Sequence, residues 1–153
     1  MKIGVPKEIK PQENRIGLTP ESVKVLSSNG NEVLVEKNGG IEAGFDNEQY
    51  KKAGAKLVDK AEDIFNDSEI IVKVKEPLSN EVKMIKENQI VFTYLHLAAA
   101  KELTQGLIDS KGVCIAYETV TDNNGRLPLL APMSAVAGRM SCLLYTSDAA
   151  DED

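Results

Sequence analysis

The sequence is poor in the residues that build disulfide frameworks and metal sites, and this shortage excludes whole classes of protein. Its 153 residues include two cysteines, Cys114 and Cys142, and one histidine. Two cysteines make no disulfide framework, and this usage fits a reducing compartment. No Cys and His residues have metal-ligand spacing, so no metal site is expected. A hydrophobic core must therefore hold the fold, and a chain of this length can bury one.

Positive charge and long apolar runs are also scarce. The formal net charge is -6 at pH 7, and the Lys and Arg residues are scattered along the chain. This pattern argues against nucleic acid and membrane surfaces as partners. No apolar run approaches the roughly 20 residues that span a bilayer, and the start MKIGVPKEIK does not resemble a signal peptide. We therefore expect a cytoplasmic protein.

Glycine-rich phosphate loops and nucleophile elbows are missing as well. No G-x-G-x-x-G opens a helix after a strand, and there is no Walker A loop and no G-x-S-x-G. The sequence itself therefore does not predict a nucleotide site within this chain.

Short runs rich in Val and Ile recur along the chain, and most are too short to be helices. Continuous apolar strands of this kind suit a sheet that is covered on both faces. The predicted strands are Lys2–Val5, Glu32–Val35, Ala55–Val58, Glu69–Val74, Gln89–Tyr94 and Gly112–Tyr117.

Helix signals lie between these strands. Thr19 followed by Pro20 and Glu21 is a typical helix start, and Asn29-Gly30 is a typical stop. Further helices are predicted from Asp46 to near Gly54, from a Ser79 cap to Ile85, over Lys101–Ile108 and over Ala131–Met140. The alternation predicts an α/β fold: an open, mostly parallel, Rossmann-like sheet with helices on both faces.

The composition changes after Ser141, where the chain reads CLLYTSDAADED with four acids among its last six residues. We interpret residues 142–153 as a non-native or truncation tail, with a natural acidic terminus as the alternative. Residues 1–141 are then the predicted domain.

Three residues that can carry chemistry follow three different predicted strands. Arg15 lies in a connection longer than the usual βα loop of about 2 to 6 residues, and an Arg can grip a carboxylate bidentately. Lys75 directly follows the strand EIIVKV, and alternation places Lys73 on the same face. His96 follows the strand Gln89–Tyr94 and can act as an acid or base near neutral pH.

Taken singly, each of these residues is as readily explained as an exposed or structural side chain. Together, two cations and an acid/base at one sheet edge match a small carboxylate beside a reactive carbonyl, with Glu118 as a fourth member that holds a cation in place. The residues therefore favour a site for a 2-oxo or 2-amino acid.

At these residues the chain closely resembles the N-terminal part of the alanine dehydrogenases, a family related to the alpha subunit of nicotinamide nucleotide transhydrogenase. The matching stretches cover residues 1–141: MKIGVPKEIKPQENRIGLTPESV, GFDNEQYKKAGAKLV, EIIVKVKEP, FTYLHLAAAKELT, AYETV and LPLLAPMSAVAGRMS. The resemblance implies NAD-dependent, reversible oxidative deamination of L-alanine to pyruvate and ammonia, in a homohexamer of two-domain subunits.

The resemblance also implies roles for individual residues. Arg15 and Lys75 would bind the substrate, with Lys75 also counted as catalytic beside the acid/base His96. Tyr94 and Glu118 would support the substrate site, Met133 would lie at the interdomain cleft, and Ser134 would touch the cofactor.

The NAD-binding domain of the family is absent from this sequence, so we expect NAD to be bound mainly outside it and the fragment itself to be inactive. The main alternative is the N-terminal piece of a transhydrogenase, whose relatives typically lack a histidine in the segment corresponding to YLHLAAA. A non-catalytic carboxylate-binding module is the other alternative.

Overall fold

The structure is a computed structural model that describes residues 1–150, with side chains for residues 1–143. The chain divides into a first unit, Met1–Ala116, and a second unit that begins at Tyr117. Each unit is described below by itself.

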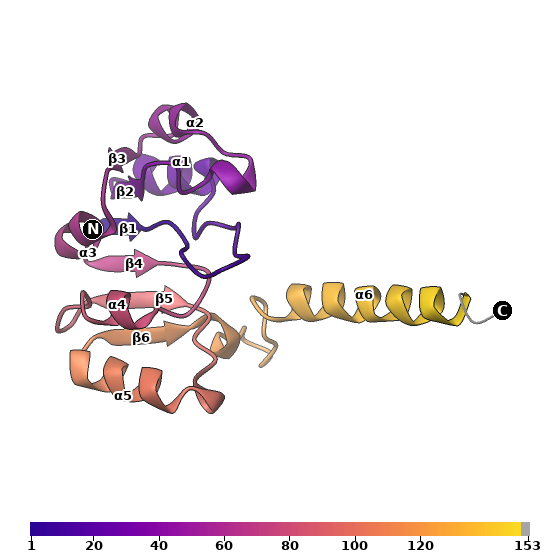
Figure 1. Cartoon of the computed structure of the whole chain (residues 1–153). Coiled ribbons are helices and arrows are strands. Elements are labelled where there is room, and N and C mark those ends of the chain that lie inside the picture. The colour runs from indigo at the N-terminus through magenta and orange to yellow at the C-terminus, as the bar shows by residue number, and fades with distance from the viewer. Residues whose placement is uncertain (151–153) are drawn as a thin grey trace. The chain divides into compact units, whose positions relative to one another are not determined.

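The first unit is built on one six-stranded sheet in which every pair of neighbouring strands is parallel. The spatial order is β3-β2-β1-β4-β5-β6, and the strand arrows in Figure 1 all point the same way. The strands are β1 (Lys2–Val5), β2 (Glu32–Glu36), β3 (Lys56–Val58), β4 (Ile70–Val72), β5 (Ile90–Thr93) and β6 (Val113–Ala116). Each predicted apolar run overlaps one of them, so the predicted open, parallel α/β sheet is confirmed.

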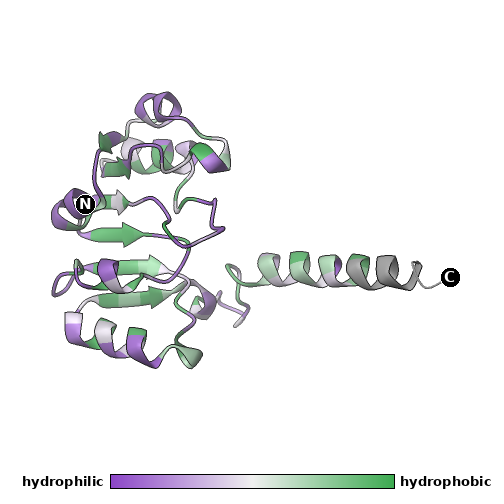
Figure 2. Cartoon of the chain, viewed as in Figure 1, coloured by the Kyte–Doolittle hydropathy of each residue, from purple (hydrophilic) through white to green (hydrophobic). Residues whose placement is uncertain are grey.

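Two separate hydrophobic cores show that helices cover both faces of the sheet. Successive residues of a strand point to opposite faces. In β2, Leu34 packs into one core with Ile64 of α3 (Ala61–Asp67), while Val33 and Val35 pack into the other with Val23 of α1 (Pro20–Ser28). Figure 2 shows mainly hydrophobic strands, whereas α2 and α3 are mainly hydrophilic.

The helix boundaries follow local capping chemistry. Thr19 caps α1, because its hydroxyl accepts a hydrogen bond from the backbone N–H of Ser22 at 3.3 Å. Asp46 caps α2 (Asn47–Lys52) in the same way through the N–H of Gln49 at 2.8 Å. Both predicted starts are confirmed, and α5 (Lys101–Ser110) lies where the sequence predicts it.

Two helices differ from the sequence-based expectation. The structure adds α3, which the apolar pattern did not single out. The predicted Ser79–Ile85 helix is α4 (Ser79–Val82), so Ser79 is its first residue and its N-cap is Leu78. The carboxylate of Glu81 accepts the Leu78 N–H at 2.8 Å, so a side chain from within the helix replaces the expected serine cap.

The second unit begins with a 3-10 turn, η3 (Tyr117–Thr119), and contains the long helix α6 (Ala131–Ala150). The helix starts where the small-residue stretch predicts and continues past Met140. The final acidic residues 151–153 of the predicted tail lie outside the described residues, and the interpretation of residues 142–153 as a tail stays a prediction. Among residues 1–150, no helix is long and apolar enough to cross a membrane.

The strand order places a topological switch point between β1 and β4. The chain leaves β1 toward β2 on one side and leaves β4 toward β5 on the other. In open α/β sheets, ligands bind outside the carboxyl ends of the strands at such a point. This rule places the candidate site at the loops after β1, β4 and β5.

Gly4 allows α3 to lie directly on β1. A Cβ atom at Gly4 would lie 2.4 Å from Oγ of Ser68 and 2.5 Å from Cγ2 of Ile64, closer than atoms can approach. We predict that Gly4→Ala lowers the free energy of unfolding by about 1–3 kcal/mol, because overpacking forces the helix outward. Urea denaturation followed by circular dichroism measures this change.

Gly138→Ala is the matched control, because nothing lies within 4 Å of a Cβ at this helical position. This control should leave stability unchanged or slightly higher. Equal stability of Gly4→Ala and the parent chain would contradict the packing of α3 on β1.

Candidate functional site

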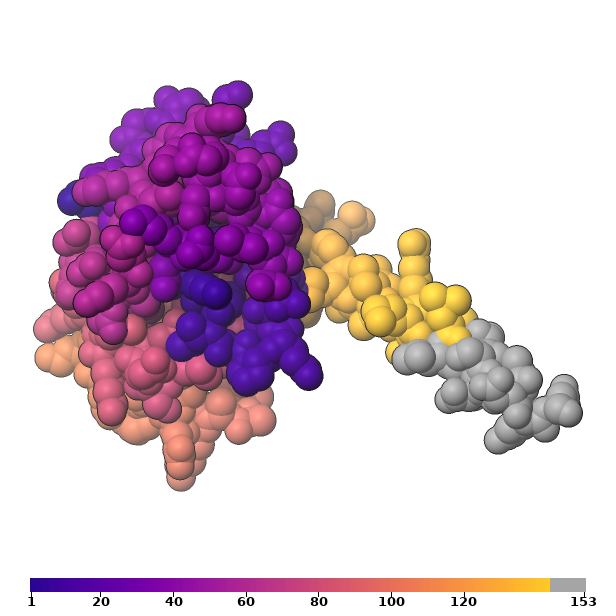
Figure 3. All heavy atoms as spheres, turned by 45° about the horizontal axis from the view of Figure 1, so that its top comes forward, coloured from indigo at the N-terminus to yellow at the C-terminus, as the bar shows by residue number. Residues whose placement is uncertain are grey.

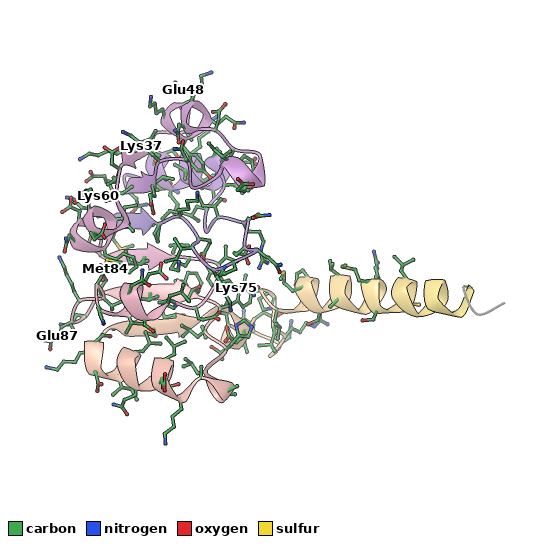
Figure 4. All side chains as sticks on the ribbon, in the orientation of Figure 1. Lys37, Glu48, Lys60, Lys75, Met84 and Glu87 are labelled. Atoms are coloured by element: carbon green, nitrogen blue, oxygen red, sulfur yellow. The ribbon has the colours of Figure 1, made fainter. Side chains whose placement is uncertain are left out.

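The candidate site lies at the sheet edge where the strands end. Lys75 lies at this edge in Figure 4, whereas Lys60, Met84 and Glu87 lie at the opposite one. Three segments of the first unit supply its side chains: the loop after β1, the residues that follow β4 and the residues that follow β5.

A buried ion triad holds two of these segments together. Lys73, directly after β4, is fully buried, and its ammonium lies 2.7 Å from Oε1 of Glu81 and 3.2 Å from Oε2 of Glu8. Glu8 belongs to the loop after β1, and Glu81 belongs to α4. Because an unpaired charge in this position would be very unfavourable, the three side chains fix the loop, the strand end and the helix relative to one another.

The same triad fixes the backbone of Lys75. The second oxygen of Glu8 accepts hydrogen bonds from the N–H groups of Val74 at 2.6 Å and Lys75 at 3.4 Å. The hydroxyl of Thr93 donates to the carbonyl of Lys75 at 2.9 Å, and the N–H of Tyr94 donates to the carbonyl of Val74 at 3.3 Å. Lys75 therefore extends from a rigid support.

The loop after β1 crosses the end of β4 at Gly17. A Cβ atom there would lie 2.5 Å from the carbonyl oxygen of Val72, so only glycine permits this approach. Arg15 is two residues away and is thereby held at the same edge. This N-terminal part of the chain, in indigo, forms part of the surface of the first unit in Figure 3.

Arg15 is paired with a carboxylate of its own loop. Its Nε lies 2.7 Å from Oε1 of Glu13, and its Nη2 lies 2.6 Å from Oε2. These hydrogen bonds from Arg15 lower the pKa of Glu13 although burial opposes them, and the charge of Lys75 lowers it further. The same contact raises the pKa of Arg15. The side chain of Glu13 is only 6% exposed, so this is a fixed ion pair.

Lys75 is half-buried at the centre of the edge. Within the part of the chain that the structure describes, its ammonium has no ion-pair partner, although its charge acts on Glu13. The cation that the sequence predicted for substrate binding is thus present and unneutralised.

His96 follows β5 in a left-handed backbone conformation, with φ 51° and ψ 41°. Few residues other than glycine adopt this conformation, and it is found more often at functional sites. The preceding Leu95 is buried in the core, which turns the residues on either side of it away from the core. The rings of Tyr94 and His96 have centroids 6.0 Å apart, and the His96 side chain is 58% exposed.

Glu76 lies between Lys10 and His96. One of its oxygens is hydrogen-bonded to Nζ of Lys10, and the other lies 3.8 Å from Nδ1 of His96. Burial raises the pKa of Glu76, but the hydrogen bond from Lys10 and the nearby positive charges outweigh it and lower the pKa below its ordinary value. Glu76 therefore places a negative charge beside the histidine.

The structure brings together four of the predicted site residues at this edge: Arg15, Lys75, Tyr94 and His96. The other three belong to the second unit. Glu118 lies in η3, while Met133 and Ser134 lie in the first turn of α6, where Oγ of Ser134 donates to the carbonyl of Leu130 at 3.4 Å. Their predicted contacts with substrate and cofactor stay predictions.

The sequence-based predictions did not include the acidic residues that pair with the cations of this edge. Each acid pairs with a specific cation: Glu76 with Lys10, Glu13 with Arg15, and both Glu8 and Glu81 with Lys73. Lys73 is therefore a buried ion-pair partner and does not line the crevice. One signal was available, because Glu13 is two residues from Arg15 in a loop already singled out. Among the described residues, no group of three or more His, Cys, Asp or Glu side chains could hold a metal ion.

Comparison with known proteins identifies close relatives of the chain. The family model described as "Alanine dehydrogenase/PNT, N-terminal domain" matches residues 4–137. An alanine dehydrogenase of Staphylococcus epidermidis is 55% identical over 141 residues, which is 92% of this chain and 38% of the relative. An alanine dehydrogenase of Methanococcus maripaludis is 49% identical over 94% of this chain and 39% of the relative. The chain thus spans about two fifths of these relatives.

Solved structures agree with these matches. An L-alanine dehydrogenase superposes with a TM-score of 0.88 at 52% identity, covering 92% of this chain and 39% of that chain. A transhydrogenase from Sinorhizobium meliloti superposes with a TM-score of 0.73 at 27% identity, covering 77% of this chain and 35% of that one.

We predict that Lys73→Met lowers the free energy of unfolding of the first unit by about 3–5 kcal/mol, because it leaves Glu8 and Glu81 buried without a cation. Chemical denaturation provides the measurement. Lys60→Met is the control, because Lys60 is exposed and at the opposite edge. The control should change stability by no more than about 0.5 kcal/mol. Equal losses for the two variants would show that the triad is not structural.

Proposed function

The chain belongs to the family of alanine dehydrogenase/PNT N-terminal domains, and from this premise we propose that it is the substrate-binding part of an L-alanine dehydrogenase. The proposed reaction is the reversible oxidative deamination of L-alanine to pyruvate and ammonia, an oxidoreductase reaction with NAD. Because the chain spans about two fifths of its relatives, this activity is proposed for a longer protein. The 153 residues alone are proposed to be inactive.

One observation carries the proposal: an unneutralised ammonium, a guanidinium and an imidazole converge at the carboxyl ends of β4, β1 and β5. Lys75 and Arg15 suit the carboxylate and carbonyl oxygens of a small 2-oxo acid. His96 lies beside them in an exposed position from which it can exchange a proton with the substrate.

Glu76 supports His96 in this role. Its charge, held in place by Lys10, favours an N–H on the Nδ1 side of the imidazole. Nε2 is the atom proposed to exchange the proton with the substrate, as in other histidines that a carboxylate orients. Tyr94, two residues before His96, is proposed to line the same site.

The pyrophosphate of NAD does not fit the crevice formed by these residues. The loop after β1 has no glycine-rich turn into α1, and it contributes the carboxylates of Glu8 and Glu13 instead. Carboxylates at this edge would repel a pyrophosphate, which binds best at a helix N-terminus with open backbone N–H groups. We propose that NAD is bound mainly outside this chain, with Ser134 as a contact.

The remaining family traits are proposals that rest on the resemblance alone. They are a homohexamer, a cytoplasmic location, a role in L-alanine catabolism, and the second-unit residues Glu118 and Met133 as contributors to the substrate site. The transhydrogenase alternative has weaker support, because its solved relative is 27% identical where the L-alanine dehydrogenase is 52% identical.

The experiment that tests the proposed function is His96→Ala in the full-length protein that contains this chain. Loss of the acid/base group should lower kcat for L-alanine oxidation roughly 10²- to 10⁴-fold, as measured by NADH formation. Asn88→Ala is the matched control, since Asn88 is an exposed residue with a left-handed backbone (φ 64°) on the amino side of β5. The control should keep its activity. An unchanged kcat in His96→Ala would end the assignment of His96 as the acid/base.

A further inference from the structure

Side chains, not a neighbouring strand, hold the backbone of Lys75. Within residues 1–143, the backbone pairing of β4 with β5 ends at Val74, whose carbonyl accepts the N–H of Tyr94 at 3.3 Å. At Lys75, a carboxylate oxygen of Glu8 accepts the N–H at 3.4 Å, and the hydroxyl of Thr93 donates to the carbonyl at 2.9 Å. The Thr93 hydroxyl therefore replaces the backbone donor that Val74 has.

Thr93 is itself fixed in place. It is the last residue of β5, lies opposite Ala116 of β6 in the parallel register, and is fully buried. A β-branched side chain in a strand has few rotamers, and a buried hydroxyl is stable only with a hydrogen-bond partner. Packing thus fixes the direction of the Thr93 hydroxyl, and the hydroxyl in turn fixes the carbonyl of Lys75.

The hydrogen bond from Thr93 joins two segments that carry reactive groups of the site. Lys75 belongs to the segment after β4, and Thr93 belongs to the strand whose continuation carries His96. A lysine side chain is long and flexible, so the position of its ammonium depends on the backbone from which it starts. Loss of the Thr93 contact would let the backbone of Lys75 turn and would move the ammonium relative to the imidazole.

We propose that Thr93 is a positioning residue for the reaction. Its hydroxyl acts through the backbone of Lys75 and holds the ammonium at the distance from His96 that a small 2-oxo or 2-amino acid spans. Small displacements of a binding group weaken catalysis strongly, so this contact matters although it touches no substrate. The inference rests on the proposed function, because it concerns how the same site holds its substrate.

Thr93→Val in the full-length protein that contains this chain tests the proposal, because valine keeps the shape of threonine and removes its hydroxyl. KM for L-alanine, KM for NAD and kcat are measured from NADH formation. KM for L-alanine should rise about 3- to 10-fold, the factor that corresponds to one neutral hydrogen bond. KM for NAD should stay unchanged, and kcat should fall by a smaller factor than KM for L-alanine rises.

Thr93→Ser separates the role of the hydroxyl from that of packing. Serine keeps the hydroxyl and loses a buried methyl group, so this variant should unfold at a lower temperature while KM for L-alanine stays close to the wild-type value. A merely structural role would lower the amount of folded enzyme, which lowers kcat and leaves both KM values unchanged. If Thr93→Val proves too unstable to assay, Thr93→Ala also removes the hydroxyl and should raise KM for L-alanine in the same way.

Thr104→Val is the matched control. The hydroxyl of Thr104, in α5, also donates to a backbone carbonyl at 2.9 Å, that of Ala100, and its side chain is half-buried. The same chemical change at this position should leave KM for L-alanine unchanged, because the bond does not hold a residue of the site.

The outcomes distinguish this inference from the proposed function. If the wild-type protein oxidises L-alanine and Thr93→Val keeps the wild-type KM for L-alanine, the positioning role is wrong and the proposed function stands. The role is equally wrong if Thr93→Ser raises this KM as much as Thr93→Val does, or if KM for NAD rises as much as KM for L-alanine. If the wild-type protein does not oxidise L-alanine, the proposed function fails and this inference fails with it.

Discussion

The pairing of buried Lys73 with Glu8 and Glu81 is the interaction on which the site depends. It joins the loop after β1, the end of β4 and the start of α4, and a lysine in this environment is tolerated only with its carboxylates in place. Because Glu8 also holds the N–H groups of Val74 and Lys75, the triad determines where the Lys75 side chain begins. The close approach of Gly17 to Val72 then holds Arg15 at the same edge.

Most of the fold could be predicted because its signals are local. The hydroxyl of Thr19 and the carboxylate of Asp46 cap helices within four residues, and strands buried on both faces read as continuous apolar runs. The short helix α4 was harder, since its start depends on Glu81 instead of a serine cap. For α3, Ile64 and Phe65 are the buried residues, too few to produce a clear helical period.

The cations of the candidate site could be predicted from the sequence, but its anions could not. Arg15, Lys75 and His96 follow three strands, and the parallel topology brings them to one edge. Their partners come from tertiary contacts instead: Lys10 with Glu76 is 66 residues apart in sequence, and Lys73 with Glu8 is 65. No local pattern reveals such pairs, and they change the chemistry of the site. Arg15 is already neutralised, and Lys75 supplies the charge that draws a carboxylate.

The measurement that tests this account most directly is a crystal structure of the 153-residue chain grown with pyruvate. The account predicts the carboxylate of pyruvate against the ammonium of Lys75, with the Glu13–Arg15 pair intact and His96 facing the carbonyl. Pyruvate bound elsewhere, or bound here with Glu13 displaced from Arg15, would contradict it.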